Sequence, residues 1–66
     1  MSAVYYCNHY PSDYIRLANE DHTDLINIAT CEHEYGGARV AEVELTLEDA
    51  EGFANHILAL VERMKK

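Results

Sequence analysis

Apolar and polar residues alternate in the middle of the chain in the pattern that is typical of β-strands. The alternation runs over residues 25–34 and again over 38–47, and a pair of glycines at 36–37 separates the two runs. Two adjacent glycines suit a two-residue hairpin turn, because such turns need positive φ angles that glycine adopts freely. The sequence therefore predicts a tight antiparallel hairpin in this region.

The pairing of the two hairpin strands follows from the position of the turn. With the glycines as the two turn residues, Glu34 lies opposite Arg39 and opposite charges match across the strands. Successive side chains in a strand point to opposite faces of the sheet. The residues expected on the core face are Ile26, Ile28, Thr30, Ala41, Val43, Leu45 and Leu47. Those expected on a wet outer face are Asn27, Ala29, Cys31, His33, Val40, Glu42 and Glu44.

Two shorter segments with strand character precede the hairpin. Residues 3–7 are rich in β-forming side chains and predict a first strand, while residues 8–13 contain a proline and indicate a connection. Residues 14–18 alternate again and predict a second strand. The polar segment 19–24 closes this strand with a turn.

A helix is predicted after the hairpin. Thr46 and Asp49 stand three residues apart, as in a capping box with Asp in place of the usual Glu. Gly52 follows in the second turn, where it is either tolerated or marks a close approach to a strand. Apolar residues then recur at intervals of three and four: Ala50, Phe53, Ala54, Ile57, Leu58, Val61 and Met64. The helix is expected to run to about the end of the chain, where basic residues complement its dipole.

Together these elements predict one α+β domain over residues 1–66. The expected architecture is an antiparallel meander of three or four strands with one C-terminal amphipathic helix packed on one face (β-β-β-β-α). A chain of 66 residues buries only about 60% of the surface that its unfolded form exposes. Small domains usually offset this with disulfides, a metal or oligomerisation, and we expect a homodimer.

The net charge of the chain limits the kinds of molecule that it is expected to bind. The chain has 12 acidic and 5 basic residues, for a net charge of -7, and the acidic ones concentrate between residues 20 and 51. Three of the five basic residues stand at the C-terminus. This distribution argues against direct binding to nucleic acid or to an anionic membrane, and it favours a protein partner with a basic surface.

The sequence also bears on the cellular compartment of the protein. No apolar run approaches the roughly 18 residues that span a bilayer, and the N-terminus lacks the pattern of a secretory signal. We therefore expect a cytoplasmic protein in which Cys7 and Cys31 are free thiols rather than a disulfide.

Two Cys-x-His steps form the most suggestive chemical pattern. Cys7 and His9 make one step, and Cys31 and His33 make the other. On neighbouring strands they would supply the two sulfurs and two nitrogens of a tetrahedral zinc site. The spacing is not that of common zinc knuckles, so we favour the alternative of a half-buried thiol beside a surface histidine, without metal or other cofactor.

Catalysis is not expected from this sequence. A Cys/His nucleophile needs a third, orienting group and a substrate cleft, which a domain of this size can hardly enclose. Five tyrosines concentrate in the first half of the chain, either as core or as an interface patch. We expect Tyr6 inside and Tyr10 outside.

These observations lead to a non-catalytic protein-binding module. Solubility alone is one explanation for the acidic residues; the other is that carboxylates imitate phosphates and occupy a nucleic-acid-binding groove. The expected partner-binding residues are Glu20, Asp21, Asp24, Glu42, Glu44 and Tyr10. In size, acidity and lack of catalytic motifs the chain is similar to small phage-encoded inhibitors, including anti-CRISPR proteins, and this resemblance implies an inhibitory role. The alternatives are a structural domain that acts as a homodimer and a zinc-binding module.

Overall fold

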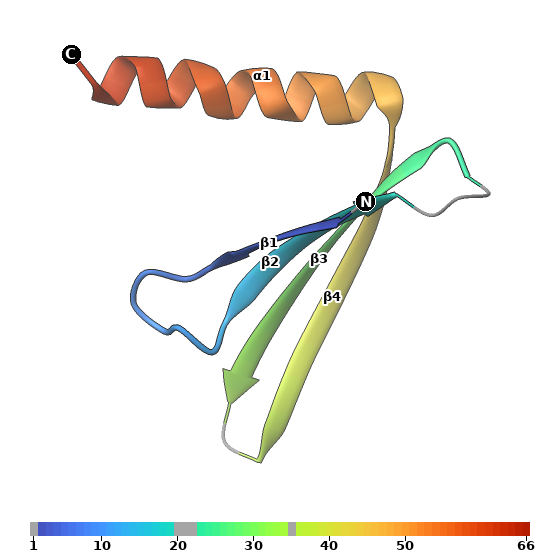
Figure 1. Cartoon of the computed structure of the whole chain (residues 1–66), viewed down its shortest axis with the longest axis vertical. Coiled ribbons are helices and arrows are strands. Elements are labelled where there is room, and N and C mark those ends of the chain that lie inside the picture. Colours follow the sequence, from blue (N-terminus) through green and yellow to red (C-terminus); the bar gives the residue numbers. More distant parts are fainter. Residues whose placement is uncertain (1, 20–22, 35) are drawn as a thin grey trace.

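The computed structural model describes residues 2–19, 23–34 and 36–66. It confirms the predicted α+β meander, with four antiparallel strands followed by one C-terminal helix (Figure 1). The elements are β1 (Ser2–Tyr6), β2 (Tyr14–Asn19), β3 (Leu25–Glu34), β4 (Gly37–Thr46) and α1 (Leu47–Met64).

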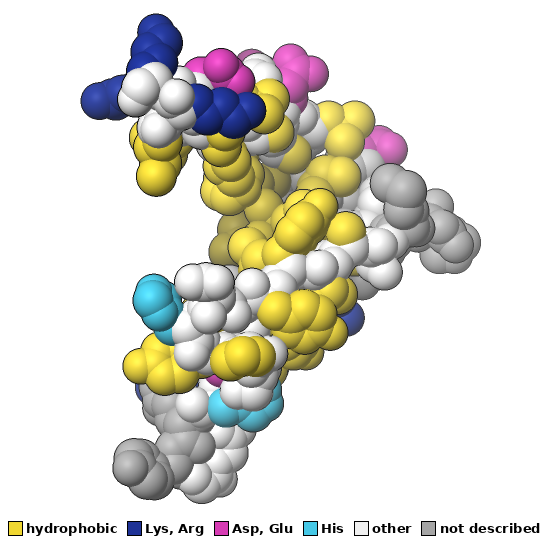
Figure 2. All heavy atoms as spheres, turned by 60° about the vertical axis from the view of Figure 1, so that its left-hand side comes forward, with side chains coloured by type: hydrophobic (Ala, Val, Ile, Leu, Met, Phe, Trp, Pro, Cys, Tyr) yellow, Lys and Arg dark blue, Asp and Glu magenta, His cyan; other side chains and the backbone are white. Residues whose placement is uncertain are grey.

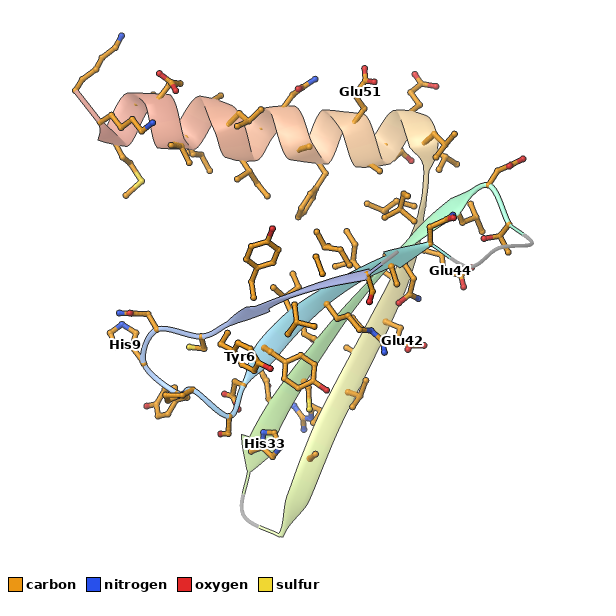
Figure 3. The ribbon with its side chains drawn as sticks, in the orientation of Figure 1. Tyr6, His9, His33, Glu42, Glu44 and Glu51 are labelled. Atoms are coloured by element: carbon orange, nitrogen blue, oxygen red, sulfur yellow. The ribbon has the colours of Figure 1, made fainter. Side chains whose placement is uncertain are left out.

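The four strands form one sheet in the order β1-β2-β3-β4. Tyr6 and Glu42 point away from α1 (Figure 3), so their face of the sheet is the outer face. The strand register places the following residues on the opposite, inner face: Ala3, Tyr5, Ile15, Leu17, Asn19, Ile26, Ile28, Thr30, Glu32, Arg39, Ala41, Val43 and Leu45. Most of the inner face is therefore apolar, whereas Glu32 and Arg39 stand opposite each other near the hairpin turn and Asn19 ends β2.

The predicted hairpin forms, but with a different register. Gly37 pairs with Glu34, and Arg39 pairs with Glu32 instead of with Glu34. Gly36 has a φ of 88°, as a hairpin turn requires. Tyr35, which precedes the predicted turn, lies outside the described residues. Moving the turn by one position shifts the pairing by two residues, and a shift of two leaves every side chain on its predicted face.

The helix begins where its cap predicts. The Thr46 hydroxyl accepts a hydrogen bond from the backbone N–H of Asp49 at 3.1 Å, which satisfies one of the free donors of the first turn. At the other end, the Lys65 N–H donates to the carbonyl of Val61. A Cβ at Gly52 would meet no atom within 4 Å outside its own helix, so this glycine is tolerated and marks no close approach to a strand.

The helix leaves the end of β4 and extends over the sheet at a steep angle (Figure 1). Within the described residues it approaches β3 and β4 and neither of the other strands. The molecule measures 40 × 37 × 16 Å, which is flat for so short a chain. One layer is thus a sheet and the other is a helix that meets it mainly at one end.

Burial corrects the expectation of a dry inner and a wet outer face. Among the described residues only Ala29 and Cys31 are buried, and both lie on the outer face. They are small residues on a central strand, flanked in the register by larger neighbours such as Tyr14 and Arg16. Tyr6, expected inside, is 68% exposed, while Tyr10 is exposed as expected. Tyr6 is on an edge strand and has neighbours on one side only.

Among the described residues, no helix combines the length and the apolar character needed to cross a membrane.

Candidate protein-binding surfaces

The most prominent surface is an open wedge between α1 and the inner face of the sheet. Figure 2 shows hydrophobic side chains on the underside of the helix and on the sheet surface that faces it, with a hollow between them. No described residue of α1 is buried. Phe53 is 43% exposed and Ile57 47%, and on the sheet Val43 is 55% exposed. The two apolar layers face each other without filling the space between them.

The apolar stripe of α1 is too wide for a single neighbour. Successive residues of a helix are rotated by about 100° about its axis. Viewed down the axis of α1, the exposed apolar side chains cover an arc of about 160° that has Leu60 at one edge, Leu58 at the other, and Ile57 and Val61 near its centre. A helix that packs on one other helix needs only a narrow seam. The width of the stripe therefore indicates contact with two surfaces.

A hollow of about 300 Å³ lies in the sheet beside the wedge. It is bordered mainly by apolar atoms of β1, β2 and β3: Ser2, Ala3, Leu17, Ala18, Asn19 and Ile26. Ala3, Leu17 and Ile26 belong to the inner face. The inner face thus offers a depression in which apolar side chains of another molecule can pack.

Carboxylates gather at the end of the sheet where β4 passes into α1. We call this the acidic end and define it by Asp24, Glu44, Glu48, Asp49 and Glu51. The β2–β3 connection adjoins it, because Leu25 pairs with Thr46. Glu51 points away from the sheet, and Glu44 lies near the junction (Figure 3). Of the predicted binding residues, Asp24 and Glu44 therefore lie at the same end of the sheet, while Glu20 and Asp21 lie outside the described residues.

Of the two remaining predicted binding residues, Glu42 stands two residues before Glu44 on the same face of β4, and Tyr10 lies elsewhere. Glu42 is on the outer face, where its Oε1 is 3.9 Å from a guanidinium nitrogen of Arg16, and both side chains are about half exposed. Tyr10 is in the β1–β2 connection, at the opposite end of the sheet from the acidic end. The structure thus separates Tyr10 from the carboxylates with which it was grouped.

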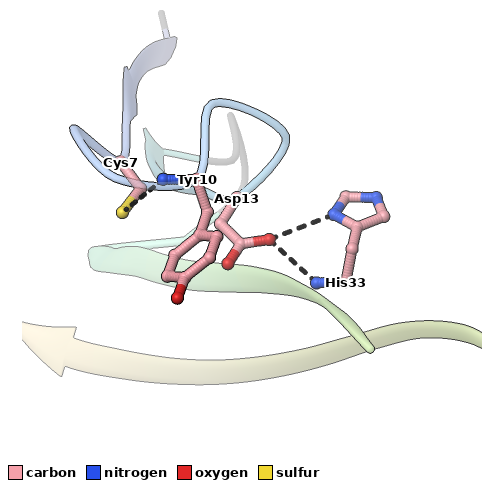
Figure 4. Close-up of polar contacts among 4 residues, drawn as sticks. All are labelled: Cys7, Tyr10, Asp13 and His33. Carbon is pink, nitrogen blue, oxygen red and sulfur yellow. Dashed lines mark hydrogen bonds and ion pairs between the residues drawn. The ribbon is translucent and has the colours of Figure 1, made fainter. Parts of the chain in front are cut away.

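The β1–β2 connection is held to the sheet by Asp13. Its Oδ1 accepts a hydrogen bond from the backbone N–H of His33 at 2.9 Å and lies 3.3 Å from His33 Nδ1 (Figure 4). The carbonyl of Asp13 also accepts from the N–H of Cys7. Sequence reasoning missed this residue, because a contact across 20 positions leaves no local signal. Its role is structural, since both of its partners are parts of the same sheet end.

The four residues of the Cys-x-His steps do not assemble a metal site. Both cysteines are free thiols, and Cys7 Sγ accepts a hydrogen bond from the N–H of Tyr10 at 3.4 Å (Figure 4). His9 and His33 lie well apart (Figure 3). In the described part of the chain, no three His, Cys, Asp or Glu side chains are placed to hold a metal ion. The geometry thus gives the zinc-binding alternative no support.

Tyr14 has an environment that disfavours its ionised form. A hydrogen bond with the Cys31 side chain raises the pKa of Tyr14 above its ordinary value of 10.0; the charge of Cys31 and desolvation act in the same direction, and Arg16 opposes them. The Tyr6 ring packs edge-on against that of Tyr14, with centroids 6.0 Å apart. These contacts close the outer face over Cys31.

The raised pKa predicts that Tyr14 loses its proton at a higher pH than an ordinary tyrosine. Because the folded state favours the neutral phenol, the contribution of Tyr14 to stability is complete below the unfolded pKa and is lost as pH rises through the higher folded pKa. An alkaline titration followed by tyrosinate absorbance is expected to show one component above the ordinary range. Tyr14→Phe is expected to remove that component, and its persistence in the variant would contradict the assignment.

Comparison of the chain with protein-family models, with curated proteins and with solved structures found no match.

Proposed function

We propose that this chain is a non-catalytic protein-binding domain. The observation that carries the proposal is the open wedge, in which an apolar helix stripe and an apolar sheet face are both left exposed. Contiguous exposed apolar surface on a small domain marks a site of interaction, because its contact with water is unfavourable until another molecule covers it. The polar contacts described above, at Asp13 and at Tyr14, hold the fold together and support no separate chemistry.

The proposal includes a second surface, the acidic end, that recognises a basic patch on a target protein. This proposal is supported by the exposure of Asp24, Glu44 and Glu48 and by the position of Glu44 on the outer face, away from the wedge. Electrostatic complementarity of this kind sets specificity and speeds association. A target with a nucleic-acid-binding groove would then be inhibited, in the manner that the resemblance to phage inhibitors suggests.

As part of the same proposal, the free thiols of Cys7, which is half-buried, and of Cys31, which is buried, support a reducing compartment, because thiols stay reduced there. We therefore place the domain in the cytoplasm.

Reversing one charge of the acidic end is expected to abolish target capture. In affinity capture from host lysate, the wild-type protein should retain a basic protein at low salt and release it at high salt. Glu44→Lys should lower retention about tenfold or more, because it places a like charge against the basic patch. The captured proteins are identified by mass spectrometry.

Glu62→Lys is the matched control for that experiment. It makes the same change of charge on α1 near the opposite end of the helix, at an exposed side chain that lies 4.0 Å from Lys65. Retention should be unchanged in this variant. Equal loss in both variants would show that net charge, rather than the acidic end, determines binding and would remove this surface from the proposal.

A further inference from the structure

We propose that the wedge is filled by a second copy of this chain, whose α1 lies antiparallel to the first. The inference rests on the proposed protein-binding function and names the occupant of the wedge. Each helix would contact the other along one part of its stripe and an inner sheet face along the rest. This arrangement accounts for the arc of about 160° that a single neighbour would leave partly exposed.

The exposed area of the chain matches a subunit of a stable dimer. The chain exposes 5870 Å², whereas a folded monomer of 7.5 kDa is expected to expose about 4,250 Å². The excess is about 1,600 Å² for each chain, or about 3,200 Å² for two. Obligate homodimers bury about 2,000–5,000 Å² in total. A second copy would thus restore an ordinary ratio of surface to mass.

The dimensions of the chain lead to the same conclusion. Its radius of gyration is 13.8 Å, whereas a compact domain of this length should have about 10.8 Å. A compact domain of twice the length should have about 14 Å. The chain is therefore as extended as half of an intertwined dimer would be.

Charge selects the antiparallel orientation of the two helices. The first turns of α1 are acidic and its last turn is basic. In an antiparallel pair related by a two-fold axis, the N-terminal part of each helix lies beside the C-terminal part of the other. Glu51 and Lys65 lie on the same side of the apolar stripe, the side of Leu58, so each can meet the other across the axis. A parallel pair would bring like charges together instead.

The contact between Glu51 and Lys65 of the partner subunit occurs twice in a two-fold dimer, so one substitution changes both copies. Lys65 also lies 4.0 Å from Glu62 of its own helix, and both of those side chains are about 70% exposed. Such an exposed pair within one helix contributes little. Lys65 is therefore available to the second copy.

A charge exchange tests the proposal. The wild-type chain, Glu51→Lys, Lys65→Glu and the double variant are compared by sedimentation equilibrium, with circular dichroism as the check that each is folded. The wild type should sediment as a dimer of about 15 kDa. Each single variant should raise the dimer dissociation constant about five- to tenfold, and the double variant should restore it to within about twofold.

Two results would overturn the proposal. One is a monomeric wild type at every concentration, and the other is a double variant that dimerises no better than the single ones. The lysate capture separates this failure from failure of the proposed function. A monomer that still captures a target through Glu44 keeps the binding function and loses only the second copy as occupant, whereas a monomer that captures nothing loses both.

Discussion

Ile57→Glu is expected to convert the dimer into a monomer, with a rise of at least about a hundredfold in the dissociation constant. Ile57 lies near the centre of the apolar stripe and is 47% exposed in the single chain. A glutamate there costs little while it faces water. In the dimer the same carboxylate would be buried without a partner, and an unpaired buried charge costs several kcal/mol. Sedimentation equilibrium measures the change.

Asn55→Glu provides the control for this substitution. It introduces the same charged side chain two residues away, on the polar side of α1. Asn55 is exposed, and the dimer should form with its wild-type affinity. If Ile57→Glu dimerises as well as Asn55→Glu does, the stripe is not an interface and the wedge has a different role.

Cys31→Asp is expected to lower the free energy of unfolding by about 2–3 kcal/mol, because it buries a carboxylate in an apolar site. Cys31 is only 6% exposed, although the sheet face around it is the one that sequence patterning assigns to solvent. Urea denaturation measures the loss. It is carried out at one fixed protein concentration, because the stability of a dimer depends on concentration.

Val40→Asp is the matched comparison. Val40 is the direct cross-strand partner of Cys31 on the outer face, but it lies on the edge strand β4 and is 59% exposed. Its substitution should cost about 1 kcal/mol or less, mainly through lower strand propensity. Equal losses for the two variants would mean that Cys31 is not part of a buried cluster, and the account of the outer face would be wrong.

Local patterns account for most of the fold that was predictable from the sequence. The limits of β3 and the Thr46 cap follow from alternation and from capping chemistry, which depend on residues close in sequence. The hairpin register was wrong by two residues because both Gly36 and Gly37 qualify for a position with positive φ. Only Gly36 adopts one, and the alternation pattern is unchanged by such a shift.

Burial was less predictable than secondary structure. The alternation in the hairpin indicates which residues share a face, but it does not show what covers that face. Ala29 and Cys31 are buried because they are small and lie on a central strand among larger neighbours from β2, and this depends on pairing between distant segments. The sequence pattern of α1 likewise predicted its apolar stripe, but it did not show that the space between this stripe and the sheet stays open.

The candidate binding residues divide in a similar way. Asp24 and Glu44 share one end of the sheet because the β2–β3 connection and the end of β4 both lie there. Tyr10 was grouped with them by composition alone, and the topology places it at the other end. The grouping of Glu20 and Asp21 with this surface stays a prediction.

The two proposed surfaces are compatible in one assembly. With the helices antiparallel, the acidic ends of the two copies lie at opposite ends of the helix pair, separated by roughly the 27 Å length of an 18-residue helix. Glu51 would be engaged across the dimer, while Asp24, Glu44 and Glu48 remain free to contact a target. The dimer would then present two equivalent acidic surfaces, which allows bivalent binding to a target with two basic patches.

Isotope-filtered nuclear Overhauser spectroscopy on a mixture of labelled and unlabelled chains reports contacts between copies only, so it detects the second copy in the wedge. We expect intermolecular contacts from the methyl groups of Ile57 and Val61 to the helix and to inner-face residues such as Leu17 of the partner subunit. Absence of intermolecular contacts at concentrations at which the chain is folded would contradict this expectation, as would contacts confined to the outer face.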